Sequence, residues 1–365
     1  MKAIAVRPAA RRIEIVEHPE PALAQPTQVL MRMLRVGICG TDREICAFDY
    51  GTPPTGSDYL VIGHESLAEV VEVGAAVTGL APGQLVVLIV RRPCGRPECV
   101  PCAAGRQDFC TTGAYRERGI KGEHGFMTER VVEDARFLVP LPASLHDVGV
   151  LVEPLTIAEK ALLEARRMLG RMPWRGDDLT GLHAIVLGGG PVGLLGAMAL
   201  ATAGCRVTLI SRQGDDDVRA GLMRTIGGAY VSAATDSLTA ILGRLGTIDL
   251  VYEAIGAAAP AFEALAALPP NALFVFTGVP GRRGAPDVDG GAVMRALVLG
   301  NQLVLGSVNA GRDAYEAAVA DLARFMTRWP QAVRALVTGS VPLDGAVAAL
   351  SSRSDGIKTV VEIGA

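Results

Sequence analysis

A glycine-rich turn between an apolar strand and an apolar helix restricts the fold of this chain more than any other feature. Residues 184–187 read AIVL, residues 188–193 read GGGPVG, and residues 192–203 have the length and composition of a helix. The turn contains the spacing G-x-G-x-x-G, in which successive glycines form the turn, admit a pyrophosphate and let the helix pack on the strand. We therefore predict a dinucleotide site, with the pyrophosphate at the helix N-terminus, formed by Gly188, Gly190, Pro191, Val192 and Gly193. A glycine-rich turn without a ligand is the alternative.

Strands alternate with helical segments along the rest of this region. A helix with Ala, Leu, Glu and Arg at helical spacing is predicted over Ile157–Leu169, before the turn. Further strands are predicted at Arg206–Ile210, Leu250–Ala254, Leu273–Thr277 and Leu303–Val308. This alternation is typical of a parallel sheet with crossover helices. We predict an α/β protein with a doubly wound Rossmann domain over residues 156–308.

The end of the second strand indicates which dinucleotide binds. Enzymes that use NAD usually carry a carboxylate there for the ribose 2′-hydroxyl. Here the residues are Ser211, Arg212 and Gln213, and the first carboxylate is Asp215. A serine hydroxyl and a guanidinium suit a 2′-phosphate, so NADP is the predicted cofactor and NAD a weaker one. The alternative is that Arg212 is a solvated surface residue.

The chain before residue 150 has a different pattern. Short β-like runs at Ile13–Val16, Val29–Val36, Leu67–Val73 and Leu85–Val90 are separated by Gly and Pro, without a long helical pattern. This predicts an irregular antiparallel β domain. Because 365 residues exceed one ordinary core, we predict a separate β-rich domain over residues 1–155, completed by a return segment over residues 309–365.

Composition excludes several classes of partner. The formal net charge is −3, which does not favour nucleic acid or a membrane surface. Apolar runs such as Leu194–Ala203 are too short to span a bilayer, and the first residues lack the apolar core of a signal peptide. We expect a cytoplasmic protein that acts on a small molecule and forms a homo-oligomer, either a dimer or a tetramer.

Four of the seven cysteines lie in one short segment. Their spacing is C-x4-C-x2-C-x7-C, over Cys94, Cys99, Cys102 and Cys110. In a reducing compartment such a cluster indicates metal binding before disulfides, and four thiolates form a closed tetrahedral zinc site. We predict a structural zinc in a lobe at about residues 91–112, its negative charge partly offset by nearby arginines, Arg91, Arg92, Arg96 and Arg106. The alternatives are a loop without metal or one that forms disulfides on oxidation.

A second set of metal-ligand types is dispersed along the chain. Cys39 lies in a turn of small residues, His64 precedes Glu65, and Glu153 lies at the predicted domain junction. Cysteine, histidine and carboxylate together can bind zinc and leave one position for water or substrate. Spacing alone does not assemble these residues into one site.

Several short motifs give the chain a resemblance to a known superfamily. They cover nearly the whole chain and read GTDREI at 40–45, GHE at 63–65, GRQDFC at 105–110, GFM at 125–127, EPLTIAEK at 153–160 and GSVN at 306–309. Together they resemble the zinc-containing medium-chain alcohol dehydrogenases, and within them the glucose 1-dehydrogenase family. The resemblance implies a GroES-like catalytic domain, a Rossmann domain and a return to the first domain.

The resemblance also implies roles for individual residues. Cys39, His64 and Glu153 would ligate a catalytic zinc, with Glu65 a neighbour or an exchanging ligand. Thr41 would relay the proton of the substrate hydroxyl. The sugar would be contacted by Thr41, Glu117, Glu153 and Asn309, and the nicotinamide side would be lined by Thr277, Gly278, Val279, Ser307, Val308 and Asn309.

The implied reaction is the oxidation of the C1 hydroxyl of an aldose such as D-glucose to the lactone. Two departures from the family affect details. Cys94 and Cys99 are four residues apart where some members have C-x2-C, and Val90 and Ile157 replace polar residues of some members. A zinc-dependent dehydrogenase of a polyol, an amino alcohol or an aminocyclitol is the alternative function. A non-catalytic NADP-binding sensor is a second alternative.

Overall fold

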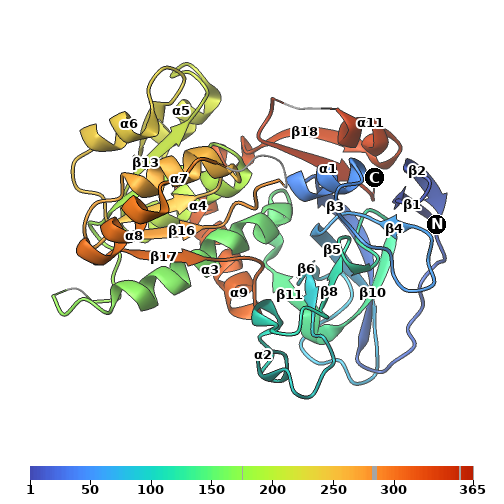
Figure 1. Ribbon diagram of the computed structural model, residues 1–365. Coiled ribbons are helices and arrows are strands. Elements are labelled where there is room, and N and C mark those ends of the chain that lie inside the picture. The colour runs from blue at the N-terminus through green and yellow to red at the C-terminus, as the bar shows by residue number, and fades with distance from the viewer. Residues whose placement is uncertain (175, 282–285, 353–354, 365) are drawn as a thin grey trace. The chain divides into compact units, whose positions relative to one another are not determined.

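The computed structural model describes residues 1–174, 176–281, 286–352 and 355–364, which form two compact units (Figure 1). The first unit comprises residues 1–156, 309–326 and 333–365, and the second comprises residues 157–308 and 327–332. The first unit is therefore built from both ends of the chain. In its return segment, positions 353–354 and 365 lie outside the described residues.

The first unit is organised around strand β3 (Gln28–Gly37). Its main sheet runs in the order β11 (Leu138–Leu141), β6 (Leu85–Leu88), β5 (Glu65–Val73), β3, β19 (Lys358–Glu362) and β18 (Val337–Pro342), with β10 (Arg130–Asp134) also paired with β3. Two smaller sheets are β2 (Arg12–Glu17), β1 (Lys2–Arg7) and β4 (Leu60–Val61), and β7 (Arg91–Arg92), β8 (Arg116–Arg118) and β9 (Gly122–Glu123). The four strands predicted here are present as β2, β3, β5 and β6, with ends shifted by one or two residues.

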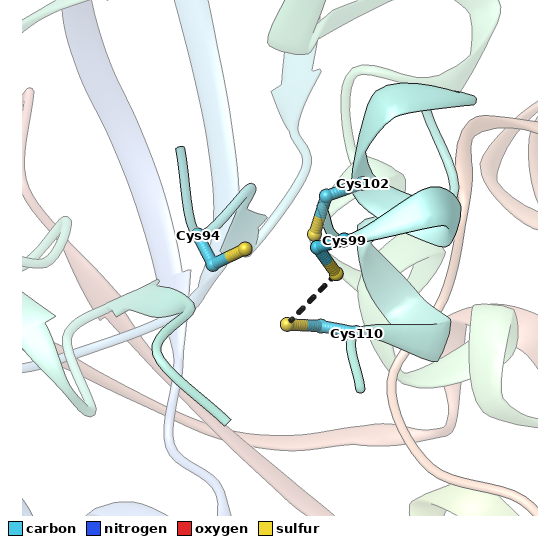
Figure 2. A group of neighbouring side chains, drawn as sticks. All are labelled: Cys94, Cys99, Cys102 and Cys110. Atoms are coloured by element: carbon cyan, nitrogen blue, oxygen red, sulfur yellow. Dashed lines mark hydrogen bonds between the residues drawn. The ribbon is translucent and has the colours of Figure 1, made fainter. Parts of the chain in front are cut away.

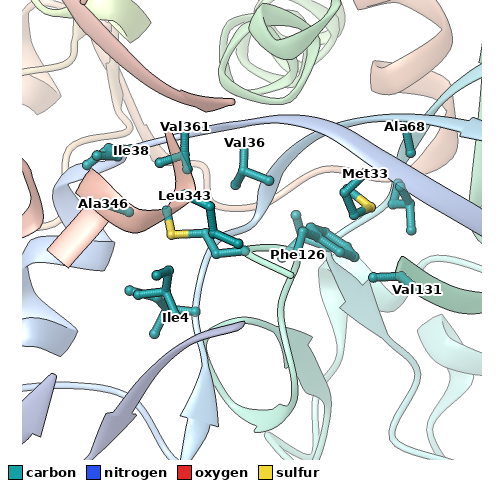
Figure 3. Close-up of a cluster of buried hydrophobic side chains, with 14 of the residues drawn as sticks. Ile4, Met33, Val36, Ile38, Ala68, Phe126, Val131, Leu343, Ala346 and Val361 are labelled. Atoms are coloured by element: carbon teal, nitrogen blue, oxygen red, sulfur yellow. The ribbon is translucent and has the colours of Figure 1, made fainter. Parts of the chain in front are cut away.

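The core of the first unit joins residues from both ends of the chain (Figure 3). Met33 and Val36 of β3 both belong to this core, because the register of the strand shifts between Met33 and Arg35. They join Phe126, while Leu343 and Val361 come from the return segment. Each of these side chains is almost completely buried, and each such burial is worth about 1.5–3 kcal/mol. The first unit therefore requires the return segment to close its core.

Short helices connect these strands. They are α1 (Gly40–Cys46), α2 (Val100–Ala103) and α11 (Ala346–Ser351), with 3₁₀ turns η1 (Gln107–Phe109), η2 (Ala135–Phe137), η3 (Ala143–Leu145), η4 (Gly149–Leu151) and η5 (Leu343–Gly345). The short helix α10 (Pro330–Arg334) has residues in both units. Two longer helices, α3 (Val152–Leu169) and α9 (Arg312–Arg328), contribute residues to both units. Helix α3 begins five residues before the predicted Ile157, because Pro154 is tolerated in its first turn. Glu153 is therefore helical.

The second unit contains a parallel sheet. Its strand order is β14 (Ala229–Ser232), β13 (Arg206–Ser211), β12 (His183–Leu187), β15 (Leu250–Glu253), β16 (Leu273–Phe276) and β17 (Leu303–Gly306), and every neighbouring pair is parallel. Its helices include α4 (Pro191–Thr202), α5 (Val218–Thr225), α6 (Leu238–Arg244), α7 (Ala258–Ala266) and α8 (Gly290–Leu299). This is the doubly wound order of dinucleotide-binding domains, so the predicted fold class is confirmed.

Strand β14 was not predicted from the sequence. It lies at the edge of the sheet, and each of its side chains is at least partly exposed. An edge strand of this kind lacks the apolar run by which buried strands are recognised.

Among the described residues, no helix has the length and hydropathy needed to cross a membrane.

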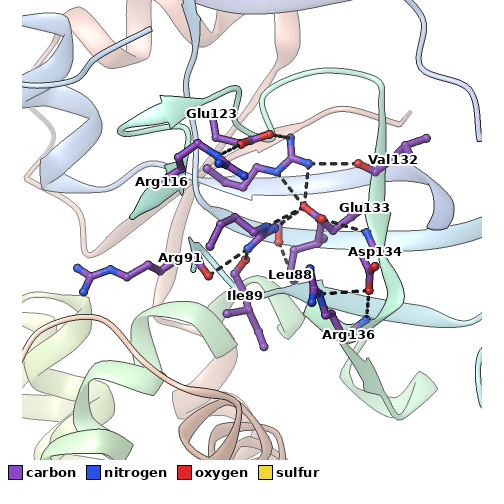
Figure 4. A network of polar contacts seen from close by, with 12 residues as sticks. Leu88, Ile89, Arg91, Arg116, Glu123, Val132, Glu133, Asp134 and Arg136 are labelled. Carbon is purple, nitrogen blue, oxygen red and sulfur yellow. Dashed lines mark hydrogen bonds and ion pairs between the residues drawn. The ribbon is translucent and has the colours of Figure 1, made fainter. Parts of the chain in front are cut away.

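A buried charge network ties β7 and β8 to β10 in the first unit (Figure 4). Glu133 Oε2 accepts hydrogen bonds from Arg92 Nε at 3.1 Å and from Arg118 Nε and Nη2 at 3.0 and 2.7 Å. Burial acts to raise the pKa of Glu133, but the two guanidiniums outweigh it and lower that pKa to about 2. The network therefore offsets the cost of burying three charges.

We predict that Glu133→Gln lowers the free energy of unfolding by about 3–5 kcal/mol, because it leaves two largely buried arginines without their counter-charge. The control is Glu123→Gln, which removes the ion pair with the half-exposed Arg116 and a longer one, of 3.9 Å, with Arg118, and should cost less than about 1 kcal/mol because Arg118 keeps Glu133. The pKa of Glu133 is depressed from 4.5 to about 2. Its contribution is therefore complete above pH 4.5 and is lost as the pH falls toward 2. Chemical denaturation of both variants across this range measures the effect, and equal losses in the two variants would contradict it.

Candidate active site

Cys39 lies where β3 ends and α1 begins. It is the N-cap residue of α1, and its backbone N–H donates a 2.8 Å hydrogen bond to Asp42 Oδ2. Two residues earlier, Gly37 pairs with Glu65 across β3 and β5. A Cβ at position 37 would lie 2.0 Å from Glu65 Oε2, so glycine is required there. The backbone thus places the Cys39 thiol close to the Glu65 carboxylate.

His64 is held beside the same turn. Gly63, at φ +90°, leaves no room for a side chain, because a Cβ would lie 2.6 Å from Met127 Cγ. The backbone N–H of Gly63 donates a 3.2 Å hydrogen bond to Asp42 Oδ1. The same oxygen lies 3.4 Å from His64 Nδ1. Burial acts to lower the pKa of His64, but Asp42 and Cys39 raise it well above its usual value. Asp42 therefore orients both the backbone and the imidazole.

Glu65 forms a buried ion pair with a residue from the return segment. Lys358 Nζ donates hydrogen bonds of 2.6 and 2.5 Å to the two oxygens of Glu65 and a third, of 3.2 Å, to Ile38 O. Both side chains are almost completely buried, at 2% and 1% exposure. The pKa of Lys358 is raised, since Glu65 and Cys39 outweigh the effect of burial. Lys358 therefore neutralises one negative charge of the site.

Cys39, His64 and Glu65 form one cluster, in which a ligand atom of each lies within 4.8 Å of the others. Glu153 is not part of that cluster, although it interacts electrostatically with His64 and Glu65. Burial is the main cause that raises the pKa of Glu153 to about 7. Thr41, in the first turn of α1, is partly buried. The structure thus groups three of the four dispersed residues.

The chemistry of the cluster fits zinc. Thiolate, imidazole and carboxylate are ligand types of catalytic zinc sites. His64 Nδ1 is buried and makes no hydrogen bond with the described residues, but it lies 3.4 Å from Asp42 Oδ1. A histidine that ligates a metal usually has a carboxylate beside its other ring nitrogen. The three residues could therefore hold a zinc ion.

The four cysteines of the lobe point toward one another (Figure 2). Cys94 precedes α2, Cys99 caps it, Cys102 lies within it and Cys110 follows η1. Their sulfurs lie within 4.8 Å of one another, including that of Cys94 despite its wider spacing. Backbone N–H groups of Cys102 and Thr111 lower the pKa of the Cys99 thiol to about 6.

The sulfur positions fit a tetrahedral metal. Cys99 Sγ and Cys110 Sγ are 3.8 Å apart, which matches the edge of about 3.8 Å that a tetrahedron with zinc–sulfur bonds of about 2.3 Å has. All seven cysteines are free thiols in the structure, since a disulfide requires about 2.05 Å. The four cysteines could therefore hold a second zinc ion.

Three of the arginines expected to offset part of the thiolate charge form ion pairs with carboxylates. Arg91 pairs with Glu117, Arg92 with Glu133 and Arg106 with Asp108. These guanidiniums are committed to carboxylates because each is at least partly buried, and a buried cation requires a nearby counter-charge.

Glu117 and Asn309 lie together in the first unit, although 192 positions separate them in the sequence. Asn309 Nδ2 donates a 3.0 Å hydrogen bond to Glu117 Oε1. Asn309 has φ +57°, a conformation that asparagine tolerates better than most residues. The two residues expected to contact a sugar therefore form a pair.

The glycine-rich turn of the second unit has the predicted form. Gly188, at φ +109°, directly follows β12, and Gly190 is the N-cap residue of α4. A Cβ at Gly193 would lie 1.9 Å from Gly188 O, whereas one at Gly190 would meet no atom of the described chain within 4 Å. The packing of helix on strand thus requires Gly193. The space at Gly190 and the N-terminal N–H groups of α4, which begins with Pro191 and Val192, suit a pyrophosphate.

Ser211 ends β13 and Arg212 follows it, as predicted, with Arg212 exposed. Ser211 Oγ donates a 2.5 Å hydrogen bond to Gln213 Oε1. A neighbouring arginine, Arg219, donates from Nε to Gly189 O at 2.8 Å and pairs with Asp217. The end of β13 therefore carries two guanidiniums, one of them exposed.

Buried Glu253 organises the loops that follow β15 and β16. It accepts hydrogen bonds from the N–H groups of Ile255 and Gly256 at 2.7 and 2.9 Å and of Gly278 at 3.2 Å. The residues expected at the nicotinamide lie in these loops and after β17: Thr277, Gly278, Val279, Ser307 and Val308. Lys160 Nζ donates to Val308 O at 3.0 Å, so this segment is also anchored.

Sequence reasoning missed Asp42, Lys358 and Glu253 as residues of the site. Asp42 lies inside the motif at 40–45, which was a usable signal. Lys358 carried no signal, because 293 positions separate it from Glu65. Glu253 lies within the predicted strand Leu250–Ala254 and is recognised as an organiser of the loops only from its contacts.

Comparison with known proteins agrees with this geometry. Residues 146–363 match the family described as glucose dehydrogenase C-terminus, and residues 25–143 match the alcohol dehydrogenase GroES-like domain. The chain is 35% identical over 368 residues to glucose 1-dehydrogenase of Methanocella arvoryzae, covering 100% of both. It is 39% identical over 369 residues to glucose 1-dehydrogenase 1 of Caldivirga maquilingensis, covering 100% of this chain and 99% of the relative.

A solved structure is similar over the whole chain. Glucose dehydrogenase of Haloferax mediterranei, in complex with NADP, Zn and gluconolactone, superposes with a TM-score of 0.89 at 34% identity and covers 100% of each chain. The resemblance found in the sequence motifs is therefore confirmed. The chain belongs to the zinc-containing medium-chain alcohol dehydrogenase superfamily, in its glucose 1-dehydrogenase family.

Proposed function

We propose that this chain oxidises the C1 hydroxyl of an aldose such as D-glucose to the lactone, with zinc and with NADP as preferred hydride acceptor. The observation that carries this function is the cluster of partly buried Cys39 with buried His64 and Glu65, in a chain that matches glucose 1-dehydrogenases over its full length. The relative whose structure holds NADP, Zn and gluconolactone supports the same cofactors and product class.

Cys39, His64 and one carboxylate hold the zinc in this proposal. Zinc there supplies Lewis acidity, which lowers the pKa of a substrate hydroxyl, and NADP supplies the hydride acceptor. Glu65 and Glu153 are the two candidate carboxylates. Glu65 already lies in the cluster, whereas the pKa of Glu153 is raised to about 7 mainly by burial, with the charge of Glu65 adding to the rise. We therefore propose that Glu65 and Glu153 exchange rather than ligate together.

The remaining residues orient the ligands and the sugar, or move a proton. Asp42 holds His64 in place through Nδ1, and Lys358 compensates the charge of Glu65. Thr41, two residues after Cys39, takes the proton of the substrate hydroxyl at Oγ1 and passes it outward. The paired side chains of Glu117 and Asn309 accept and donate hydrogen bonds to the sugar hydroxyls, which fixes the sugar's orientation.

The nucleotide is held by the second unit. The N–H groups at the start of α4 bind the pyrophosphate, while Ser211 and Arg212 bind the 2′-phosphate of NADP. The loops containing Thr277–Val279 and Ser307–Val308, with Asn309 after them, line the nicotinamide side. The contacts of Glu253 and Lys160 hold these loops.

The function is tested by initial rates with D-glucose, D-galactose, D-xylose and a few polyols, each with NADP and NAD. We expect an aldose to be the best substrate, with formation of its lactone. Cys39→Ser should abolish turnover and leave the fold and NADP binding intact, because a neutral hydroxyl is a poor replacement for a thiolate ligand. A higher kcat/KM for a polyol, or turnover by a metal-free Cys39→Ser variant, would contradict the proposal.

The proposed zinc of the cysteine lobe is tested by Cys102→Ser. Metal binding supplies folding free energy, so this variant should contain one zinc fewer per chain. Its Tm should fall by several degrees, since each kcal/mol corresponds to roughly 2–4 °C in units of this size. The control is Cys205→Ser, which removes a buried thiol of the second unit. Metal analysis and thermal unfolding are the measurements. Unchanged zinc content in Cys102→Ser would exclude zinc from the lobe.

Cofactor preference is tested at the end of β13. A charge-assisted hydrogen bond at a solvated site is worth about 1–3 kcal/mol, so the wild type should prefer NADP by roughly tenfold or a little more. Ser211→Asp should reverse the preference, and Arg212→Ala should weaken NADP and barely change NAD. Arg206→Ala, which alters an exposed arginine at the opposite end of β13, is the control. The readout is kcat/KM for both cofactors, and unaltered NADP kinetics in Arg212→Ala would show that another residue binds the phosphate.

A further inference from the structure

Arg91 is almost completely buried, and its guanidinium is surrounded by partners. It lies in β7, directly opposite Glu117 of β8 in the antiparallel register. Nε and Nη2 lie 3.0 and 2.9 Å from Glu117 Oε1, and Nη1 donates a 3.1 Å hydrogen bond to Asp108 O. The ring centroid of Tyr115 lies 3.8 Å from the guanidinium carbon. These contacts leave Arg91 little freedom to move.

The carboxylate that Arg91 holds is also the one paired with Asn309. Glu117 Oε1 therefore lies at hydrogen-bond distance from three N–H groups, two from Arg91 and one from Asn309 Nδ2 at 3.0 Å. Within the described parts of the chain, no hydrogen bond reaches Glu117 Oε2. All of the hydrogen-bond contacts that fix the side chain are thus made through one oxygen.

The same arginine connects this pair to the cysteine lobe. Asp108 lies in η1, two residues before Cys110, and its carbonyl is the acceptor for Arg91. The carboxylate of Asp108 accepts hydrogen bonds of 3.0 and 2.8 Å from Arg106. Arg106 Nη1 also lies 3.3 Å from Asp313 Oδ2, at the start of α9. Asp313 follows Asn309 by four residues. Glu117 and the segment that carries Asn309 are therefore both tied to η1.

We propose that Arg91 is a positioning residue for the sugar. It holds Glu117 with Asn309 in the geometry that binds sugar hydroxyls and transmits the position of the cysteine lobe to that pair. This inference rests on the proposed function, in which Glu117 and Asn309 contact the substrate.

The effect of Arg91 comes from the geometry of its guanidinium. The planar fork can bind Glu117 and a backbone carbonyl at the same time, whereas a lysine ammonium keeps the charge without that fork. Arg91→Lys therefore retains charge balance but loses the simultaneous contact with Asp108 O. A displacement of about 1 Å in a binding group can lower rates about 100-fold. We expect kcat/KM for D-glucose to fall about 10- to 100-fold, mainly through KM.

The experiment compares Arg91→Lys with Arg92→Lys in the full-length, zinc-loaded enzyme. Arg92 is the next residue of the same strand, is equally buried and pairs with Glu133 instead of Glu117. The measurements are KM and kcat for the sugar, the dissociation constant for NADP, zinc content and Tm. We expect both variants to lose thermal stability, and Arg91→Lys alone to raise KM for the sugar. NADP binding and zinc content should be unchanged in both.

A double-mutant cycle separates positioning from a general structural effect. In a Glu117→Gln background, Arg91→Lys should cause little further rise in KM, because the group that it positions has already been altered. Independent effects of the two substitutions would overturn the inference, as would an equal rise in KM for Arg92→Lys. An unchanged KM for the sugar in Arg91→Lys would also overturn the inference. The proposed function would still hold in that case, provided that the wild type oxidised glucose. If the wild type prefers a polyol, the proposed function fails, and the same comparison with that polyol decides the role of Arg91.

Discussion

The buried ion pair between Glu65 and Lys358 is the interaction on which the rest of the candidate site depends. Glu65 is buried because β5 begins opposite the end of β3, where Gly37 leaves space for its carboxylate. A buried carboxylate without a counter-charge costs several kcal/mol, and Lys358 offsets that cost. The lysine belongs to β19, which also pairs with β3. The last strand therefore completes both the sheet and the charge balance of the cluster.

Buried arginines play a similar role in the small sheet of β7, β8 and β9. Arg92 and Arg118 meet at Glu133, and Arg91 meets Glu117. Neighbouring residues of one strand thus serve two separate carboxylates, one in a purely structural network and one in the proposed sugar site. Each of these buried arginines has a carboxylate partner close by, so the strands that carry them can lie beside both the cysteine lobe and the pair of Glu117 and Asn309.

The sequence by itself determined the features whose residues are close together in the chain. The glycine turn at 188–193 was predicted with its strand and helix, because the steric reasons for Gly188 and Gly193 act within one turn. The grouping of the four cysteines was readable for the same reason, as they lie in one short segment. The strands with longer apolar runs were predictable, whereas the short strands of the first unit, the strands of the return segment, the part-exposed edge strand β14 and the early start of α3 were not.

Only the tertiary structure decided which distant residues become partners. It grouped Glu65 rather than Glu153 with Cys39 and His64, and it brought Lys358 to Glu65. It also directed Arg91 to Glu117 rather than to the thiolates. The physical reason is that burial makes an unpaired charge costly, so each buried charge takes the partner that strand pairing places within reach. The number of positions between two residues in the sequence does not predict the distance between their side chains until the strands have paired.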